Sequence, residues 1–387
     1  MAQDRRAPTV PPAKRRLHPR PRRDMSSAGQ QAASGSAPVT TRLKGSKQMP
    51  TAGWIDVPVC EALLTKDIKV LTSVDGSPNS MVALKYITDG LLQQDRRAFV
   101  RVLHVYDESK KYLPPECTRD RLKLAVESLL TSSVSSKRYQ LAWVRKHAPG
   151  STGQQINEAI DSLPADFACM GFFGLKGTKR DITMLGATLR TNVADVLNRG
   201  NSCSLICIKD EDPELLPIRT KKAVFVVSVS LNKSSTKAFL DALRLSKPGD
   251  EIHVVYVKSY LEREDSDYTA EVRLKYEGFF ASFRDDGQQT FSNFHDRLVK
   301  FELVSKERRE SVPQAVVRYA DEVEADFLVV GASVKDRVAR GKKPVGSVSL
   351  QICLMTERNF IVANWIDVAP QVYDNHVGRS TSMRRVW

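Results

Sequence analysis

The chain has 387 residues, long enough for two domains of ordinary size, and its 41% hydrophobic and 27% charged residues are typical of a globular protein. It contains no run of about 18 apolar residues, so we expect no membrane-spanning helix and no membrane partner. The six cysteines show no CxxC pair and no nearby His cluster. This pattern predicts buried, reduced thiols of an intracellular protein and no structural metal.

The net charge of +14 is concentrated at one end. Residues 1–50 hold 11 Lys/Arg and two Asp, so they carry +9 of it, and the remaining sequence is nearly balanced. The basic isoelectric point therefore says little about the function of the folded part.

Residues 1–60 are predicted to form a disordered basic arm rich in Pro and Arg, because they cannot bury enough apolar surface to offset their ordering entropy. Within the arm, residues 14–23 (KRRLHPRPRR) gather basic side chains around two prolines. A polyanion-binding or nuclear-import patch and a solvated tail both fit this segment. We expect a cytoplasmic location, with the nucleus as the alternative, and the Arg-rich, acid-poor composition leaves organellar targeting open.

Residues 61–210 alternate β-branched runs with helical patterns, which predicts a parallel, doubly wound sheet of about five strands. The expected strands are Ile68–Val74, Phe99–Tyr106, Arg138–Val144, Asp166–Met170 and Ser204–Ile208. The expected helices are one after Ser77-Pro78, then Arg119–Leu130, Gln154–Ser162 and Ala187–Asn198. Ser77-Pro78 is typical of an N-cap followed by the first helical residue.

The same order of elements starts again after a charged linker with prolines at 211–222. A second unit at 223–366 has expected strands Ala223–Val229, Glu251–Val257, Val299–Val304, Phe327–Val330 and Asn359–Ala363. Its expected helices are Ser234–Leu245, Val312–Glu322 and Ser347–Met355, with an irregular, polar helical stretch before the third strand. Residues 367–387 form a polar tail. The predicted fold class is α/β, with two doubly wound, five-stranded, parallel-sheet, Rossmann-like domains in tandem.

A residue-by-residue match shows that the two units are copies. Ala165-Asp166-Phe167 recurs 160 positions later as Ala325-Asp326-Phe327, and the pairs Gly171/Gly331 and Gly186/Gly346 keep that offset. We infer an internal duplication.

Two loops of the first unit would lie at the carboxyl ends of its strands, where open α/β sheets bind ligands. One follows Ser73 and contains Asp75, and the other runs from Gly171 to Thr188. Two interpretations of the glycines in the second loop stay open. They form a cradle for phosphate at a helix N-terminus, or they only allow strand-to-helix turns.

These residues resemble the universal stress protein family. The resemblance rests on VDGSPNS after the first strand, LHVYD in the second, and the glycine loop, and it covers residues 65–210 well and 222–364 more weakly. It implies adenine-nucleotide binding, with ATP and Mg²⁺ as cofactors. The site residues that it implies are Ser73, Asp75, Val105, Met170, Gly171, Gly174, Gly186, Ala187 and Thr188.

The sequence departs from the family pattern in two ways. Eleven residues instead of nine separate Gly174 from Gly186, and Ala187 replaces a Ser or Thr. In the second unit, Ser230 stands in the position of Asp75 and Val334 in that of Gly174, so we predict a degenerate site there, with an anion-binding role of Gly346-Ser347 as the alternative.

Two functions therefore compete. The main hypothesis is a binding or sensing protein for adenine nucleotide in stress response, with its site in the first unit. The alternative is a nucleotide-free scaffold for protein partners with both sites degenerate. No catalytic residue can be named from the sequence, so we expect at most weak ATP hydrolysis. The resemblance also implies that Ser204–Ile208 and Asn359–Ala363 pair side by side as a pseudo-dimer within one chain.

Overall fold

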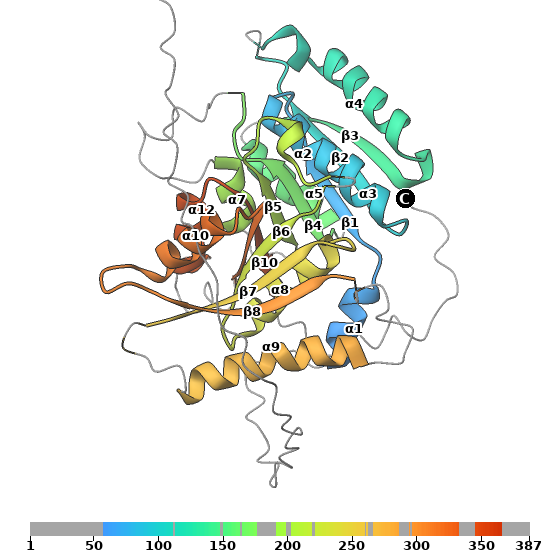
Figure 1. The fold of residues 1–387 in the computed structure, drawn as a ribbon. Helices are drawn as coiled ribbons and strands as arrows, with labels where there is room; N and C mark the ends of the chain where they lie inside the picture. Colours follow the sequence, from blue (N-terminus) through green and yellow to red (C-terminus); the bar gives the residue numbers. More distant parts are fainter. Residues whose placement is uncertain are drawn as a thin grey trace, which may run out of the picture. The chain divides into compact units, whose positions relative to one another are not determined.

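The computed structural model describes residues 57–110, 113–147, 150–162, 165–175, 191–198, 203–218, 221–259, 261, 266–285, 294, 296–332 and 345–365. The basic segment 14–23 and the tail 367–387 lie outside the described residues. Strands β1–β5 and their helices are called the first half below, and β6–β10 and theirs the second half (Figure 1).

The first described element is a helix that the sequence did not predict. Helix α1 spans Val57–Thr65, so the expectation of a disordered arm is wrong for residues 57–60. Cys60 and Leu64, one turn apart, are buried on one face. This face packs against helix α8 of the second half, which explains why the segment is ordered.

The first half follows the predicted order. Its strands are β1 Lys69–Ser73, β2 Phe99–Tyr106, β3 Tyr139–Arg145, β4 Phe167–Gly171 and β5 Ser204–Ile208. Its longer helices are α2 Pro78–Lys85, α4 Arg119–Ser133, α5 Thr152–Ser162 and α7 Thr191–Asn198. As predicted, Ser77 caps α2 by accepting a hydrogen bond from the amide of Ser80, and Pro78 is the first helical residue. Helix α2 continues through a π-helix, η1 (Tyr86–Leu91), into the short α3 (Leu92–Gln94).

The second half repeats this order. Its strands are β6 Val224–Ser228, β7 Glu251–Lys258, β8 Leu298–Ser305, β9 Phe327–Ala332 and β10 Asn359–Asn364. Its helices are α8 Lys233–Leu245, α9 Asp267–Asp285, α10 Val312–Glu322 and α12 Ser347–Met355. The stretch expected to be helical but irregular contains helix α9, so its helical character is confirmed, and the helix is regular over Asp267–Asp285.

The ten strands form one continuous sheet in the order β3-β2-β1-β4-β5-β10-β9-β6-β7-β8. Within each half all neighbours are parallel, as predicted. The two final strands pair as expected, and the pairing is antiparallel, with Ile361 opposite Ile206. The carboxyl ends of the strands in the two halves therefore point to opposite edges of the sheet.

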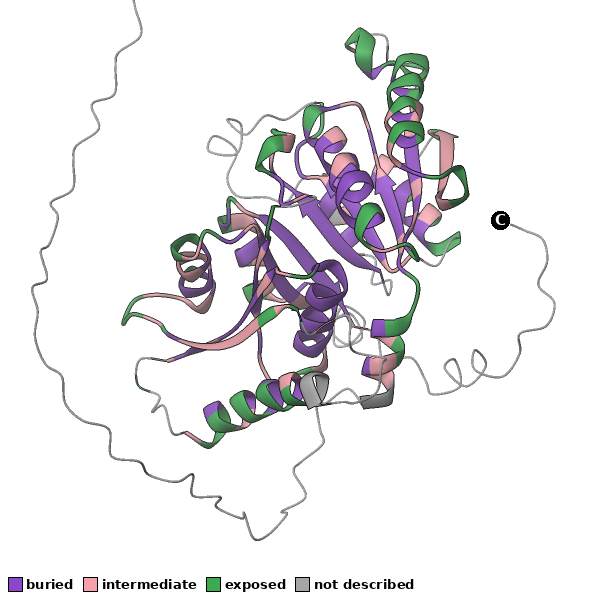
Figure 2. Cartoon of the chain, turned by 45° about the vertical axis from the view of Figure 1, so that its right-hand side comes forward, coloured by how far each residue is buried: buried purple, intermediate pink, exposed green. Residues whose placement is uncertain are grey.

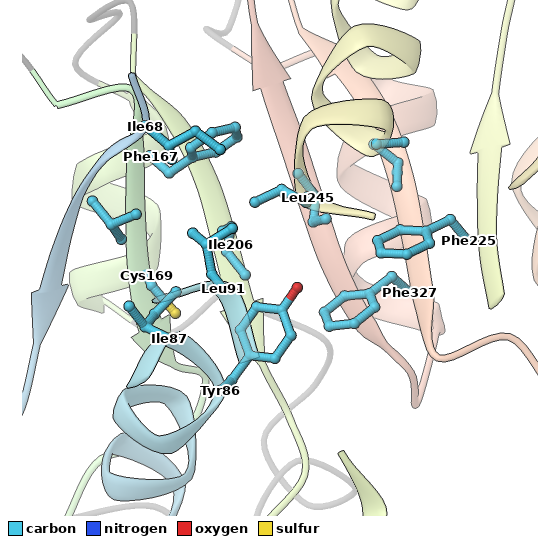
Figure 3. Close-up of a cluster of buried hydrophobic side chains, with 14 of the residues drawn as sticks. Ile68, Tyr86, Ile87, Leu91, Phe167, Cys169, Ile206, Phe225, Leu245 and Phe327 are labelled. Atoms are coloured by element: carbon cyan, nitrogen blue, oxygen red, sulfur yellow. The ribbon is translucent and has the colours of Figure 1, made fainter. Parts of the chain in front are cut away.

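Helices cover both faces of the sheet, and the core lies in two layers. One layer contacts α2, α4, α8 and α9, and the other contacts α5, α7, α10 and α12. The first layer runs across both halves, where Tyr86 of η1 packs on Phe327 of β9 (Figure 3). Figure 2 shows buried strands between these helices and the exposed outer faces of α4 and α9.

The segment expected to be a linker is packed onto the first half. It contains a 3₁₀ turn at Pro213–Leu215, and Leu216 after it is buried. Ile218 lies against Gly90 in η1. Residues 211–218 therefore link β5 to β6, as predicted, and Leu216 and Ile218 pack in the core.

Candidate functional site

A cavity of about 580 Å³ opens at the carboxyl ends of β1, β2 and β4. Strand β1 lies between β2 and β4, so this is the point where the chain reverses its direction of travel across the sheet, the usual ligand position in such folds. Six of the nine predicted site residues line the cavity. They are Ser73, Asp75, Val105, Met170, Gly171 and Gly174. The other three, Gly186, Ala187 and Thr188, lie outside the described residues.

The Asp75 carboxylate joins the two loops that the sequence singled out. Its Oδ1 accepts hydrogen bonds from the amide and hydroxyl of Ser77, at 3.0 and 2.5 Å, and its Oδ2 accepts one from the amide of Leu175 at 3.3 Å. Gly76 follows with φ of +83°, a left-handed conformation that favours glycine. Asp75 is therefore a clamp on the start of the glycine loop as well as part of the cavity wall.

Gly171 is required by packing. A Cβ at this position would lie 2.7 Å from Oδ1 of Asn79 and 2.8 Å from the amide nitrogen of Ser80. Strand β4 can approach the first turn of α2 this closely only with glycine, and Asn79 then accepts a hydrogen bond from the amide of Phe173 at 2.9 Å. The close packing of β4 on α2 is thus sufficient to account for glycine at this position.

Charged side chains that the sequence did not single out surround the mouth of the cavity. Besides Asp75, the lining residues include the carboxylates of Asp107, Glu108 and Asp120 and the cations Lys110 and Arg119. Glu108 pairs with Arg145 at 2.9 Å, and the guanidinium of Arg119 lies 4.7 Å from the ring centroid of Tyr106. Asp107 and Glu108 directly follow β2, which lies next to β1, and this position is the signal that could have identified these two residues.

Two buried groups in the cavity wall are held uncharged. Burial lowers the pKa of His104, and the hydrogen bond from Nδ1 to the carbonyl of Val74, at 2.8 Å, only partly opposes this. Burial raises the pKa of Cys117, whose thiol donates to the carbonyl of Gly76 at 3.3 Å. His104 is buried, as expected of a core histidine, and all six cysteines are buried and free, as predicted.

The corresponding turn of the second half is closed by helix α9. Ser230 and Leu231 replace Asp75 and Gly76, and their carbonyls accept hydrogen bonds from the hydroxyl of Tyr276 at 3.0 Å and from Nζ of Lys275 at 3.2 Å. Both donors are fully buried. Gly346 caps α12 as predicted for the end of the glycine loop, but the residues between it and Ala332 are described only from Val345 onward.

Among the residues that the structure describes, no group of His, Cys, Asp or Glu has the arrangement of a metal site. Over the same residues, no helix has both the length and the apolarity needed to cross a bilayer.

The model of the universal stress protein family matches residues 221–354. The chain carries a universal stress protein domain. The match falls on the half whose sequence resemblance we judged the weaker. No curated protein matches the chain.

Two solved structures show the same fold over both halves. A universal stress protein from Archaeoglobus fulgidus DSM 4304 is 18% identical, with a TM-score of 0.50 over 79% of this chain and 99% of that chain. A functionally unknown protein from Pseudomonas aeruginosa PAO1 is 12% identical, with a TM-score of 0.50 over 78% of this chain and 94% of that chain. Because each likeness covers more than three-quarters of this chain, the fold is shared over both halves.

Proposed function

We propose that the first half binds an adenine nucleotide, with ATP as the ligand, and that the protein acts in nucleotide binding or sensing. The observation that carries the proposal is the convergence of six predicted site residues on one cavity at the switch point of the sheet. The cavity of about 580 Å³ is large enough for a nucleoside.

The charges of the described wall favour ATP as its magnesium complex. Asp75, Asp107, Glu108 and Asp120 would repel a free tetra-anion, whereas Mg²⁺ cancels part of the charge of the triphosphate. Of these, Asp107 already accepts hydrogen bonds from Ser109 and pairs with Lys146 at 3.7 Å, which reduces its repulsion. We therefore expect chelation of Mg²⁺ to weaken binding.

Val105→Trp tests the assignment of the cavity. Val105 lines the cavity from β2, and a larger side chain there occupies the space of the base, so we expect Mg²⁺-ATP affinity to fall at least about tenfold. Val144 is the matched control, since it is the partner of Val105 in β3, packs on the same core layer and is not among the lining residues. Calorimetric titration of the full chain with ATP and Mg²⁺ measures both variants.

Two outcomes would contradict the proposal. Wild-type protein that shows no saturable binding at millimolar Mg²⁺-ATP leaves the scaffold function as the better account of the fold. Equal loss of affinity in Val105→Trp and Val144→Trp would place the nucleotide elsewhere. If the chain binds a protein partner and Asp75→Ala does not weaken that binding, the scaffold function gains further support.

A further inference from the structure

A side chain of the second half holds the backbone at the end of β5 in the first half. Asn359, the first residue of β10, is 2% exposed. Its Oδ1 accepts hydrogen bonds from the amides of Lys209 and Asp210, at 2.8 and 3.3 Å, and its Nδ2 donates to Oδ2 of Asp210 at 2.7 Å. Because β10 and β5 are antiparallel, Asn359 stands at the edge of the sheet on which the cavity opens.

The contact continues from Asp210 to the glycine loop. The carbonyl of Asp210 accepts a hydrogen bond from Nδ2 of Asn79 at 2.6 Å, and Oδ1 of Asn79 accepts one from the amide of Phe173 at 2.9 Å. Asn79 is 2% exposed, so water does not compete well for these bonds. Phe173 lines the cavity, two residues before the amide that Asp75 clamps.

Aromatic side chains run alongside the polar contacts. The ring of Phe360, next to Asn359, lies 5.9 Å from that of Phe172, which lies 5.0 Å from that of Phe173, both edge to face. Lys209 Nζ lies 4.5 Å from the Phe172 ring centroid and donates to the carbonyl of Cys353 in α12 at 2.8 Å. The start of the glycine loop is thus packed against β10 by apolar as well as polar contacts.

The residues at the equivalent positions make different contacts in the other direction. In the duplication, Ser204 occupies the position of Asn359, and Ser234 that of Asn79. Ser204 donates instead to Oδ2 of Asp241 at 2.6 Å, and Ser234 donates to Oδ1 of Asn232 at 2.8 Å. Ser204 and Ser234 are therefore bonded to other partners than those that their counterparts Asn359 and Asn79 hold.

We propose that the degenerate second half positions the nucleotide loop of the first half through Asn359, Asp210 and Asn79, here called the Asn359 relay. Asn359 is a positioning residue, because it acts on Phe173 through two other residues. The proposal rests on the proposed nucleotide binding for its effect on affinity, but the order of the loop can be measured without nucleotide. Asn364→Ala is a matched control, since Asn364 is the last residue of the same strand, equally buried, and donates to Cys203 at the far end of β5.

Hydrogen exchange of the full-length apo protein tests the relay itself. Asn359→Ala leaves two amides and one carboxylate oxygen without their partner, so we expect the amides of residues 172–175 to exchange about tenfold faster than in wild type. Asn364→Ala should leave these amides unchanged while it alters exchange near Cys203. Unchanged exchange at 172–175 in Asn359→Ala would overturn the relay, whether or not the protein binds nucleotide.

Titration with Mg²⁺-ATP tests the consequence for binding. We expect Asn359→Ala to weaken affinity about five- to tenfold, Asn79→Ala to do the same, and the double variant to be no weaker than either, since both break one chain of contacts. Asn364→Ala should bind as wild type does. Additive losses, or an equal loss in Asn364→Ala, would overturn the coupling. A wild type that binds no nucleotide would refute the proposed function, and the exchange result would still decide the relay.

Discussion

At Gly171 the backbone of β4 approaches helix α2 so closely that a Cβ would lie 2.8 Å from a backbone nitrogen. The same constraint recurs at Gly331, where a Cβ would lie 2.4 Å from the backbone of Ser234. The repeat of this glycine therefore follows from helix-on-strand packing, which both halves need. Nucleotide binding, which is proposed for the first half alone, would not explain the glycine in the second half.

We predict that Gly171→Ala destabilises the fold by about 2–3 kcal/mol, because the added methyl must displace the first turn of α2. Gly278→Ala is the control, since nothing lies within 4 Å of a Cβ at that position of α9. Alanine should stabilise that helix by up to about 1 kcal/mol. Urea unfolding of both variants measures the difference, and similar midpoints would contradict the packing argument.

At the scale of elements, the sequence predicted every described strand to within two residues, because short β-branched runs alternate with amphipathic helices. It missed the regularity of α9, although Thr269, Val272, Tyr276 and Phe279 are buried at helical spacing. The polar residues between these buried positions obscure their helical periodicity in the sequence. Helix α1 was missed because it is ordered by contact with α8, a partner 170 residues away that no local pattern indicates.

Part of the candidate site could be predicted from the sequence in the same way as the strands. Strand ends could be located from the pattern, so the loops with Asp75 and Gly171 were found, whereas Val105 was implied by the family resemblance; all three line one cavity. Arg119 and Asp120 start a helix after an irregular loop, and the path of such a loop depends on tertiary contacts that the sequence does not display.

Helix α9 carries a buried lysine whose charge state should affect stability. Burial lowers the pKa of Lys275 to about 8 from 10.5. Between these values the unfolded chain holds one more proton than the folded chain, so this group makes the fold more stable as pH rises. We predict that, relative to Lys275→Met, wild type gains about 1 kcal/mol between pH 8 and pH 9 in urea unfolding. A pH-independent difference between the two proteins would refute this.

At the scale of the whole described molecule, the contact between the halves is asymmetric. On one side of the β5–β10 pair, Asp166 of the first half meets Arg244 of α8 at 3.6 Å and Lys66 at 2.9 Å. On the other side, the ring of Tyr86 in η1 packs on that of Phe327 in β9. The duplication placed equivalent residues on both sides of this contact, and these residues have since diverged. Each half is therefore complementary to the other half and not to a second copy of itself.

Asp166 and its repeat counterpart Asp326 make a matched pair for testing this asymmetry. Each accepts a hydrogen bond from the first residues of the neighbouring strand, Lys69 and Val224, at 2.9 Å. Burial alone would raise the pKa of both carboxyls, and nearby cations oppose this effect. At Asp166, Arg244 and Lys66 outweigh burial and the pKa is lowered, whereas at Asp326 burial prevails and the pKa is raised.

Substitution of each by asparagine should therefore have different effects. Asp166→Asn leaves the buried Arg244 without its counter-ion, and we expect a loss of about 3 kcal/mol at pH 7. Because the folded pKa of Asp166 lies below the unfolded one, that loss should shrink as pH falls below about 4, where the unfolded carboxyl takes up a proton. Asp326→Asn removes a carboxylate that the fold disfavours, so stability at pH 7 should be unchanged or higher. Urea unfolding at pH 7 and again below pH 4 measures both variants. Equal losses for the two would mean that the ion pairs with Arg244 and Lys66 add nothing to the contact between the halves.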